Sequence, residues 1–280
     1  MAKVTHHDNG SISVNRTDAF VEAIDNRSAF DLPNFGEFIR EIEEGIREEH
    51  EGVTRGALNN SRGEWYETLI ALAANEFART EGTEFALVRL PNVNIFSCEN
   101  LYQAEIATLI SDLRATLREE ADVSLISSNP DFVVVSAALL DLPDISDVDS
   151  SVLDKVNSLY ASLEGAARFD EIIGYCSVKS GLRPDRRLQI AHEGSLMKAL
   201  YRHIQTRLWA IDAPGIRYFG IAGACGEADR EALKTVATHS IVDVLGKPES
   251  AVDELFQVNT PEELRVTLKQ ILAPKNLGKN

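Results

Sequence analysis

The sequence predicts an α/β fold in which a central mixed β-sheet is flanked by helices. Short apolar runs rich in β-branched and aromatic residues, typical of buried strands, occur at 85–90, 133–135, 172–178 and 216–222. Amphipathic stretches typical of helices separate them. No repeat, low-complexity segment or linker interrupts the 280 residues. We therefore expect one domain over residues 1–280, with a helical N-terminal part to about residue 120 and a core at about 121–257.

The N-terminal part contains most of the expected helices. Residues 1–15 show no periodicity and should be loose, and 53–63 reads as a polar loop. Helices are expected at 17–26, 36–50, 64–77 and 100–120, because apolar residues recur there at helical spacing. The run at 85–90 should be a short strand between the last two helices.

The core should alternate strands and helices. Pro130 interrupts the chain and Asp131 opens the strand at 133–135. After an acidic loop at 143–150 we expect a helix at 152–168 and the strand at 172–178. A turn with Pro184 then leads to a helix, followed by strands at 216–222 and 233–244 and helices at 250–256 and 261–272. The residues expected on the buried face of the helix after Pro184 are Leu188, Ala191, Ser195, Ala199, Ile204 and Leu208.

The distribution of charge qualifies the net charge of −16. An overall negative charge argues against a nucleic-acid partner. Yet residues 176–217 carry eight Lys or Arg against three Asp or Glu, whereas acidic residues concentrate elsewhere, notably at 37–51. One positive surface on an acidic body is suited to binding phosphate at a defined place.

The composition also indicates the cellular compartment. No apolar run reaches membrane-spanning length, and the first residues lack the pattern of a signal peptide. Cys98, Cys176 and Cys225 are scattered without the spacing of a zinc site or a disulfide framework. We expect a reduced, cytoplasmic protein without a membrane partner.

Four charged residues could converge at one edge of the sheet. Asp131 opens one strand, Lys179 closes another, Glu193 lies in the helix after that strand, and Glu67 lies in the helix at 64–77. Phosphodiester hydrolysis needs carboxylates that hold a hard divalent cation, and it gains from a lysine beside the attacking water. Taken singly, each residue has an ordinary alternative, since an Asp after Pro can cap a turn and a helical Glu is usually solvated.

The turn at 183–187, with sequence RPDRR, has a chemistry of its own. An arginine can bind guanine bidentately in the major groove, and a carboxylate can accept a hydrogen bond from cytosine. Two arginines flanking one aspartate can therefore read a GG/CC step, and a twofold dimer would read CCGG. A surface turn held by salt bridges would explain the same residues.

These segments resemble a known family. The pattern PD at 130–131, SVK at 177–179 and RPDRRLQIAHEGSLMKALY at 183–201 closely resembles the type II restriction endonucleases that cut around a central CCGG. They form a tetrameric branch of the PD-(D/E)XK nuclease superfamily. The likeness extends over about residues 120–257, and GEWYETLI at 63–70 also matches.

The resemblance implies a role for each matching residue. Asp131 matches the metal-binding aspartate and Lys179 the catalytic lysine. Ser177 stands where the superfamily usually has an acid, and Glu193 matches the acid that this branch supplies from the following helix. Glu67 matches an additional acid near the metal. Arg183, Asp185 and Arg186 match the residues that read CCGG.

Three further residues have weaker assignments. Asn60 is a candidate for the minor groove, and Arg230 is a candidate for reading a base beside CCGG, although an exposed arginine needs no such role. Trp209 is either core or interface, and the tetramers of the branch favour interface.

The resemblance thus implies a PD-(D/E)XK restriction-endonuclease-like fold and a Mg²⁺-dependent endonuclease acting on double-stranded DNA. It would cut before the first C of CCGG within a palindrome such as RCCGGY, leaving 5′-phosphates on four-base 5′ overhangs. A homodimer would bind one site, and two dimers would form a tetramer. The alternatives are a CCGG cutter with other flanking bases, an inert sequence-specific DNA-binding protein, and a metal phosphohydrolase acting on nucleotides.

Overall fold

A five-stranded mixed sheet forms the centre of the protein in the computed structural model, which describes residues 3–8, 12–125, 129–210, 212–241 and 247–274. Its strands are β3 (Phe85–Arg89), β4 (Phe132–Ser136), β5 (Ile172–Lys179), β6 (Arg217–Ala222) and β7 (Glu254–Gln257). They lie in that order across the sheet. The pairs from β3 to β5 are antiparallel and those from β5 to β7 are parallel. The predicted α/β fold with a central mixed sheet is confirmed.

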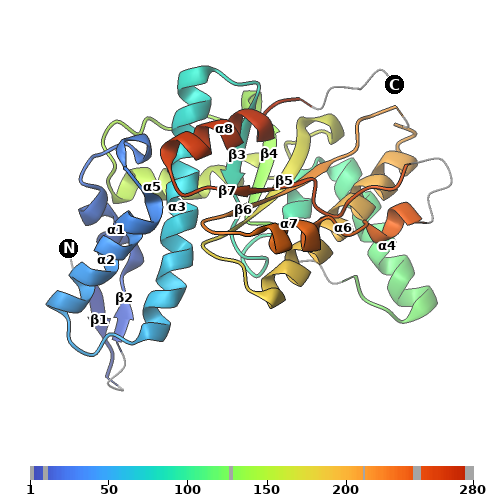
Figure 1. Ribbon diagram of the computed structural model, residues 1–280. Coiled ribbons are helices and arrows are strands. Elements are labelled where there is room, and N and C mark those ends of the chain that lie inside the picture. The colour runs from blue at the N-terminus through green and yellow to red at the C-terminus, as the bar shows by residue number, and fades with distance from the viewer. Residues whose placement is uncertain (1–2, 9–11, 126–128, 211, 242–246, 275–280) are drawn as a thin grey trace.

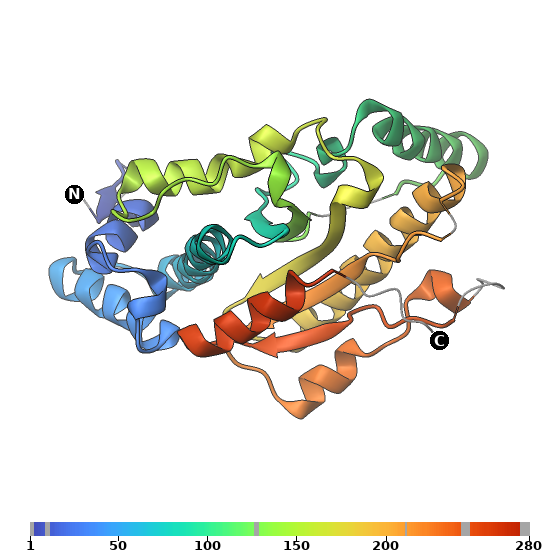
Figure 2. The ribbon, with the colours of Figure 1, turned by 90° about the horizontal axis from the view of Figure 1, so that it is seen from above.

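Helices cover both faces of this sheet (Figures 1 and 2). One face packs against α1 (Arg16–Ile24), α2 (Phe35–Glu49), α3 (Arg55–Glu81), α5 (Ser150–Ser158) and α8 (Pro261–Ile271). The other packs against α4 (Ala104–Ala121), α6 (Pro184–Arg207) and α7 (Glu227–Leu233). A small antiparallel hairpin, β1 (Val4–His6) with β2 (Ile12–Val14), lies beside the first turns of α3 (Figure 1). No helix in these described ranges has the length and apolar character needed to cross a bilayer.

Strand β4 shows why the central strands read as continuous apolar runs. Phe132 and Val134 face the α3 side, whereas Val133 and Val135 face the α6 side, and all four are fully buried. Successive side chains of a strand point to opposite faces, so a sheet covered on both faces has no solvent-facing positions to fill with polar residues.

The strand directions bring distant residues to one edge of the sheet. Because β4 is antiparallel to both neighbours, its first residue lies beside the ends of β3 and β5: Phe132 pairs with Arg89 and with Cys176. Lys179 at the end of β5 pairs in turn with Ala222 at the end of β6. Arg89, Asp131 and Lys179 are therefore neighbours although they are far apart in the sequence.

Helix α6 is fixed closely against the segment that leads into β7. A Cβ atom at Gly194 would collide with the carbonyl oxygen of Ala251, so only glycine allows this approach. The buried Lys198 ammonium donates to the Ser250 carbonyl at 2.8 Å and pairs with Asp253 at 2.8 Å. These contacts hold the middle of α6, which carries Glu193, in one position over the sheet.

Three expectations for the chain before residue 170 are wrong. The polar stretch 53–63 is the start of α3, because the Thr54 hydroxyl caps the helix by accepting from the Ala57 amide and Leu58 is buried. Residues 1–15 contain the β1–β2 hairpin rather than only loose chain. The helix expected at 152–168 ends at Ser158, and a 3₁₀ helix, Leu159–Leu163, follows.

Two C-terminal expectations are also wrong. Instead of a strand from 233 to 241, Leu233 ends α7 and a 3₁₀ helix, Thr238–Ile241, follows; residues 242–244 lie outside the described part. Instead of a helix at 250–256, the chain pairs with β6 as strand β7.

The expected buried face of α6 is wrong in part. Leu188 is 76% exposed, and the residues that face the sheet are Ile190, Met197, Leu200, Tyr201 and Ile204, together with Ala191. The buried face of α6 is thus rotated about the helix axis relative to the expected face. This rotation places Glu193 on the buried side.

Candidate active site

Asp131 and Lys179 meet at the sheet edge. The Asp131 Oδ2 atom accepts hydrogen bonds from the Lys179 ammonium at 2.6 Å, the Val178 amide at 2.6 Å and the Ser177 hydroxyl at 3.0 Å. All three donors come from the end of β5, and the antiparallel register of β4 places Asp131 opposite them. Both charged side chains are four-fifths or more buried. Because these bonds all engage Oδ2, they orient the carboxylate with Oδ1 on its other side.

Glu193 is oriented from the opposite face of the sheet. Its Oε1 atom accepts from the Gln189 amide one helical turn earlier at 2.9 Å, and its Oε2 atom accepts from the Tyr218 hydroxyl of β6 at 2.9 Å. Burial, then the negative charges of Glu193 and Asp131, raise the pKa of Tyr218 well above its usual value, so this hydroxyl stays a hydrogen-bond donor. Both of these donors are neutral, and they fix the direction of the carboxylate oxygens.

Glu67 reaches the same edge from α3 and is tied to Arg89. The Arg89 guanidinium, at the end of β3, donates at 2.8 Å to both Glu67 and Glu64. Burial, and next the charge of Asp131, raise the pKa of Glu67 to about 7. The positive charges of Arg89 and Lys179 oppose this shift. Glu67 therefore lies within electrostatic reach of the Asp131–Lys179 pair.

A polar groove of about 1340 Å³ opens over this edge. Its walls come from α2 and α3 on one side, and from the chain after β5 and the start of α6 on the other. The charged lining residues are Arg40, Glu43, Arg62, Glu64, Glu67, Lys179, Arg183 and Arg186. The groove exceeds the usual size of a small-molecule pocket, roughly 300–1,000 Å³. Its size suits a polymeric substrate better than a nucleotide.

The predicted recognition turn borders this groove. Arg183 is the N-cap residue of α6, and its guanidinium contacts the Asp185 carboxylate at 3.3 Å, with both side chains about two-thirds exposed. Arg186 donates to the Gln189 side chain at 3.0 Å. Arg187 differs, because it points to α7 and pairs with Asp229 at 2.5 Å. Arg183 and Arg186 line the groove.

The other three candidates lie in different surroundings. Asn60 is exposed on α3 and lines the groove. Arg230 lies on α7, and its guanidinium donates to the Leu255 carbonyl of β7, outside the groove lining. Trp209 follows α6 with 81% of its surface exposed and a left-handed backbone (φ 54°).

The carboxylates of Asp131, Glu193 and Glu67 suit a hard divalent cation, although they do not form a ready-made metal site. Within the described ranges, no three His, Cys, Asp or Glu side chains are arranged to hold a metal ion. The predicted convergence is therefore direct for Asp131 and Lys179 and looser for Glu193 and Glu67. Carboxylate oxygens are the ligands that Mg²⁺ and similar ions prefer. Asp131 and Glu193, each oriented by fixed donors, are the residues that could supply them.

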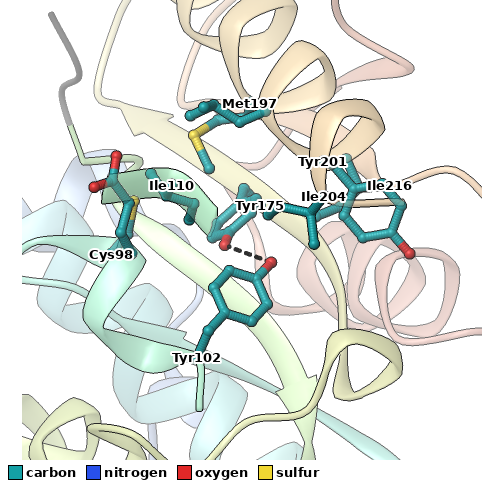
Figure 3. Close-up of a pocket in the computed structure, with 10 residues that line it drawn as sticks. Cys98, Tyr102, Ile110, Tyr175, Met197, Tyr201, Ile204 and Ile216 are labelled. Carbon is teal, nitrogen blue, oxygen red and sulfur yellow. Dashed lines mark hydrogen bonds between the residues drawn. The ribbon is translucent and has the colours of Figure 1, made fainter. Parts of the chain in front are cut away.

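A second cavity, of about 10 Å³, lies on the α6 side of the sheet (Figure 3). Met197, Tyr201 and Ile204 of α6 line it together with Tyr102 and Tyr175, whose hydroxyls are 3.3 Å apart. It holds about one water molecule at most. This crevice is a packing feature and not a substrate site.

Comparison with known proteins decides the family. The Cfr10I/Bse634I restriction endonuclease model matches residues 4–274. The chain belongs to the Cfr10I/Bse634I restriction endonuclease family. It is 42% identical to the type II restriction enzyme Cfr10I of Citrobacter freundii over 229 residues. This match covers 79% of this chain and 80% of that enzyme. The protein is therefore a type II restriction endonuclease that cleaves DNA at a specific site.

Solved structures agree with this assignment. The chain is similar to the type IIF restriction endonuclease Bse634I with cognate DNA, at a TM-score of 0.87 and 28% identity over 97% of this chain and 98% of the other. A second structure of Bse634I gives the same values. The likeness confirms the PD-(D/E)XK restriction-endonuclease-like fold expected from the sequence. As a Cfr10I/Bse634I family member, the protein binds DNA, and the family generally depends on a divalent metal.

Sequence reasoning missed the residues that orient the predicted acids. Gln189 lies four residues before Glu193 on one helix, and this spacing was a usable signal. Arg89 closes a predicted strand, as Lys179 does, and could have been identified in the same way. Tyr218 and Ser177 carried no signal, because their contacts depend on the packing of α6 and on the register of β4.

The raised pKa of Glu67 predicts a pH-dependent effect on stability. Its folded-state pKa, about 7, exceeds the value of 4.5 for an unperturbed carboxyl group, so the protonated form favours the folded state. This contribution is complete below about pH 4.5 and is lost as the pH rises through about 7, at most about 3 kcal/mol. Glu67→Gln keeps a neutral side chain throughout. Its unfolding free energy relative to the wild type should therefore increase between pH 5 and pH 8.

Urea titrations in EDTA at several pH values measure this difference. Glu81→Gln, an exposed residue at the end of α3, is the matched control and should show no such trend. A Glu67→Gln difference that is the same at pH 5 and pH 8 would mean that the site does not raise the pKa of Glu67.

Proposed function

We propose that this endonuclease hydrolyses double-stranded DNA at palindromic sites with a CCGG core, R^CCGGY, in a Mg²⁺-dependent reaction. The observation that carries the proposal is the contact of Asp131 with Lys179 at the sheet edge, beside a groove of about 1340 Å³ that Lys179 lines. A carboxylate and a lysine at this place are the groups that phosphodiester hydrolysis needs.

Asp131 and Glu193 would hold the cation, and Glu67 would assist. A bound Mg²⁺ would supply positive charge against the pentavalent phosphate and lower the pKa of a bound water. Asp131 would present its Oδ1 atom, because Oδ2 is engaged by β5. Glu193 would present an oxygen whose direction Tyr218 and Gln189 fix. Arg89 would hold Glu67 near the same place.

Lys179 would place its ammonium beside the scissile phosphate and the attacking water. Its hydrogen bond to Asp131 keeps the Nζ atom at the sheet edge, from which it can donate to a non-bridging phosphate oxygen. The water adds to phosphorus opposite the 3′ oxygen, which leaves and takes up a proton. The products are a 3′-hydroxyl and a 5′-phosphate, on four-base 5′ overhangs in this proposal.

Arg183, Asp185 and Arg186 would read the CCGG bases from the major groove. They stand at the start of α6, where Arg183 and Arg186 line the groove and Asp185 is exposed beside Arg183. The contacts of Arg183 with Asp185 and of Arg186 with Gln189 are local to this segment. Guanine O6 and N7 suit the arginines, and cytosine N4 suits the aspartate. Asn60 would approach from the α3 wall in the minor groove, and Arg230 would read the flanking base.

We propose a homodimer on each site and a dimer-of-dimers tetramer. A palindromic site requires two copies of the recognition turn related by a twofold axis. Trp209 supports a further contact, because 81% of its surface is exposed and tryptophan is enriched among the residues that anchor protein interfaces.

We also propose that residues 1–280 act as one cytoplasmic endonuclease domain, with a helical N-terminal part to about residue 120 and a catalytic and recognition core at about 121–257. The N-terminal helices share a buried cluster with strands of the sheet, which supports one unit. The three cysteines are free thiols, which suits a reducing compartment.

Variants at the sheet edge test the catalytic assignment. Asp131→Asn should retain specific DNA binding and lose cleavage by at least about a thousandfold, since an amide cannot supply the anionic ligand. Plasmid digestion with Mg²⁺ or EDTA measures cleavage, and sequencing the cut ends reports the site. Cleavage in EDTA, or an active Asp131→Asn protein, would contradict the proposal. Loss of binding together with cleavage would point to misfolding instead.

Arg186→Ala separates the proposal from the nucleotide phosphohydrolase alternative in the same assays. If the proposal is right, this variant should no longer cleave DNA at CCGG. An enzyme that hydrolyses nucleotides would keep its rate of nucleotide hydrolysis after the same change.

Trp209→Ala tests the proposed tetramer. The variant should sediment as a dimer at concentrations at which the unmodified protein is a tetramer, while its melting temperature stays within a few degrees, because the side chain is not part of the core. Leu188→Ala, which changes an exposed apolar residue on α6, is the control and should leave the tetramer intact. A tetrameric Trp209→Ala protein would place the second interface elsewhere.

A further inference from the structure

The wall of the groove formed by α2 and α3 contains an unusual ion pair. The Arg62 guanidinium donates through Nη2 to the Oε2 atom of Glu43. Glu43 lies on α2 with only 2% of its side chain exposed, whereas the Arg62 side chain is 44% exposed. The carboxylate is therefore buried behind a half-exposed arginine that lines the groove.

Glu43 is costly for the protein alone. Its Oε1 atom is buried without a hydrogen-bond partner in the described structure. A buried carboxylate with one oxygen unpaired costs free energy, and an apolar residue at this place on α2 would avoid that cost. What the carboxylate provides is a fixed direction for the planar fork of Arg62, which would otherwise sample many rotamers.

The same wall contains a glycine that the fold does not require. Gly63 lies inside the 27-residue helix α3 and lines the groove. A Cβ atom built at Gly63 would meet nothing within 4 Å. Glycine weakens a helix interior relative to alanine. The empty space therefore benefits a bound molecule that approaches the helix closely, and not the packing of the protein.

We infer that this face of α3 is a seat for the sugar–phosphate backbone of bound DNA, with Glu43-tethered Arg62 as a phosphate clamp and Gly63 as the point of closest approach. Arg62 acts from the wall opposite the recognition residues Arg183 and Arg186, and Asn60 lies on the same stretch of α3. A guanidinium held by a carboxylate on one side presents paired donors to a phosphate on the other. The inference rests on this groove being the DNA-binding groove.

The proposed contact of Arg62 with a phosphate predicts how the affinity for DNA depends on salt. Arg62→Ala should weaken binding by on the order of tenfold, to specific and scrambled duplexes alike, and reduce the slope of log affinity against log salt by about one. Arg62→Lys keeps the charge without the fork and should bind between the two. Arg79→Ala removes one charge from the far end of α3, where it pairs with Asp144, and should bind as the wild type.

Glu43→Gln gives a test that depends on sign. Removing a negative charge from a DNA groove should strengthen binding if Glu43 acts only through its charge. If Glu43 instead holds Arg62 in a fixed direction, Glu43→Gln alone should weaken binding, because Arg62 loses that direction. In the Arg62→Ala background the same change should strengthen binding. Strengthening in both backgrounds would overturn the tether.

Gly63→Ala tests the close approach. The variant should melt at a higher temperature than the wild type and yet bind the specific duplex about tenfold more weakly, since the added methyl fills the seat. Gly45→Ala is the matched control: Gly45 is also inside a helix, a Cβ there meets nothing within 4 Å, and it lies outside the groove lining. It should gain stability without a change in binding. Wild-type binding by Gly63→Ala would overturn this part of the inference.

Fluorescence anisotropy of full-length protein with a labelled duplex, in Ca²⁺ to prevent cleavage, measures all of these affinities. Arg183→Ala in the same assay distinguishes a failure of the Arg62 phosphate clamp from a failure of the groove as the DNA-binding site. If Arg183→Ala weakens specific binding and Arg62→Ala does not, the phosphate clamp is wrong and the groove stands. If neither variant changes binding, the groove is not the DNA site.

Discussion

The hydrogen bonds that the Asp131 Oδ2 atom accepts from the end of β5 are the constraint on which the site depends. They require β4 to start where β5 ends, which only antiparallel neighbours in this register allow. They also require an acidic residue directly before an apolar strand, so that the charge lies at the edge while the next four residues are buried. The lysine and the aspartate thus occupy one position in the fold because of strand direction, not sequence proximity.

Two other layers carry the other two predicted acids. Helix α6 carries Glu193 inward because Gly194 lets it approach the chain before β7, and Tyr218 of β6 holds the carboxylate. Helix α3 carries Glu67, and Arg89 of β3 fixes it. Each acid therefore has a donor on the sheet that directs it. In the proposed site, these carboxylates from three parts of the chain would serve one metal ion.

The sequence was informative where local pattern and tertiary environment agree. The apolar runs of β3 to β6 are continuous because both sheet faces are covered, and Asp131 and Lys179 stood out as charges at the ends of such runs. The likeness of the RPDRR segment to a known family supplied the functional class, which charge pattern alone left open. Family membership by comparison then confirmed that class.

Prediction from sequence failed where the environment overrides local preference. Residues 53–63 are mostly polar, yet most of them form the start of α3, because Thr54 caps the helix and Leu58 packs into the core. Strand β7 is four residues long and exists because it pairs with β6. The position of Glu43 relative to Arg62 and that of Tyr218 relative to Glu193 depend on packing between separate elements, which periodicity cannot report.

The most direct test of the account is anomalous diffraction from crystals of the protein with a CCGG duplex and Mn²⁺ in place of Mg²⁺. We expect an anomalous peak bound by carboxylate oxygens of Asp131 and Glu193 at roughly 2.2 Å, with Lys179 beside the phosphate between C and its 5′ neighbour. A peak held by other residues, or a duplex bound away from this sheet edge, would contradict it.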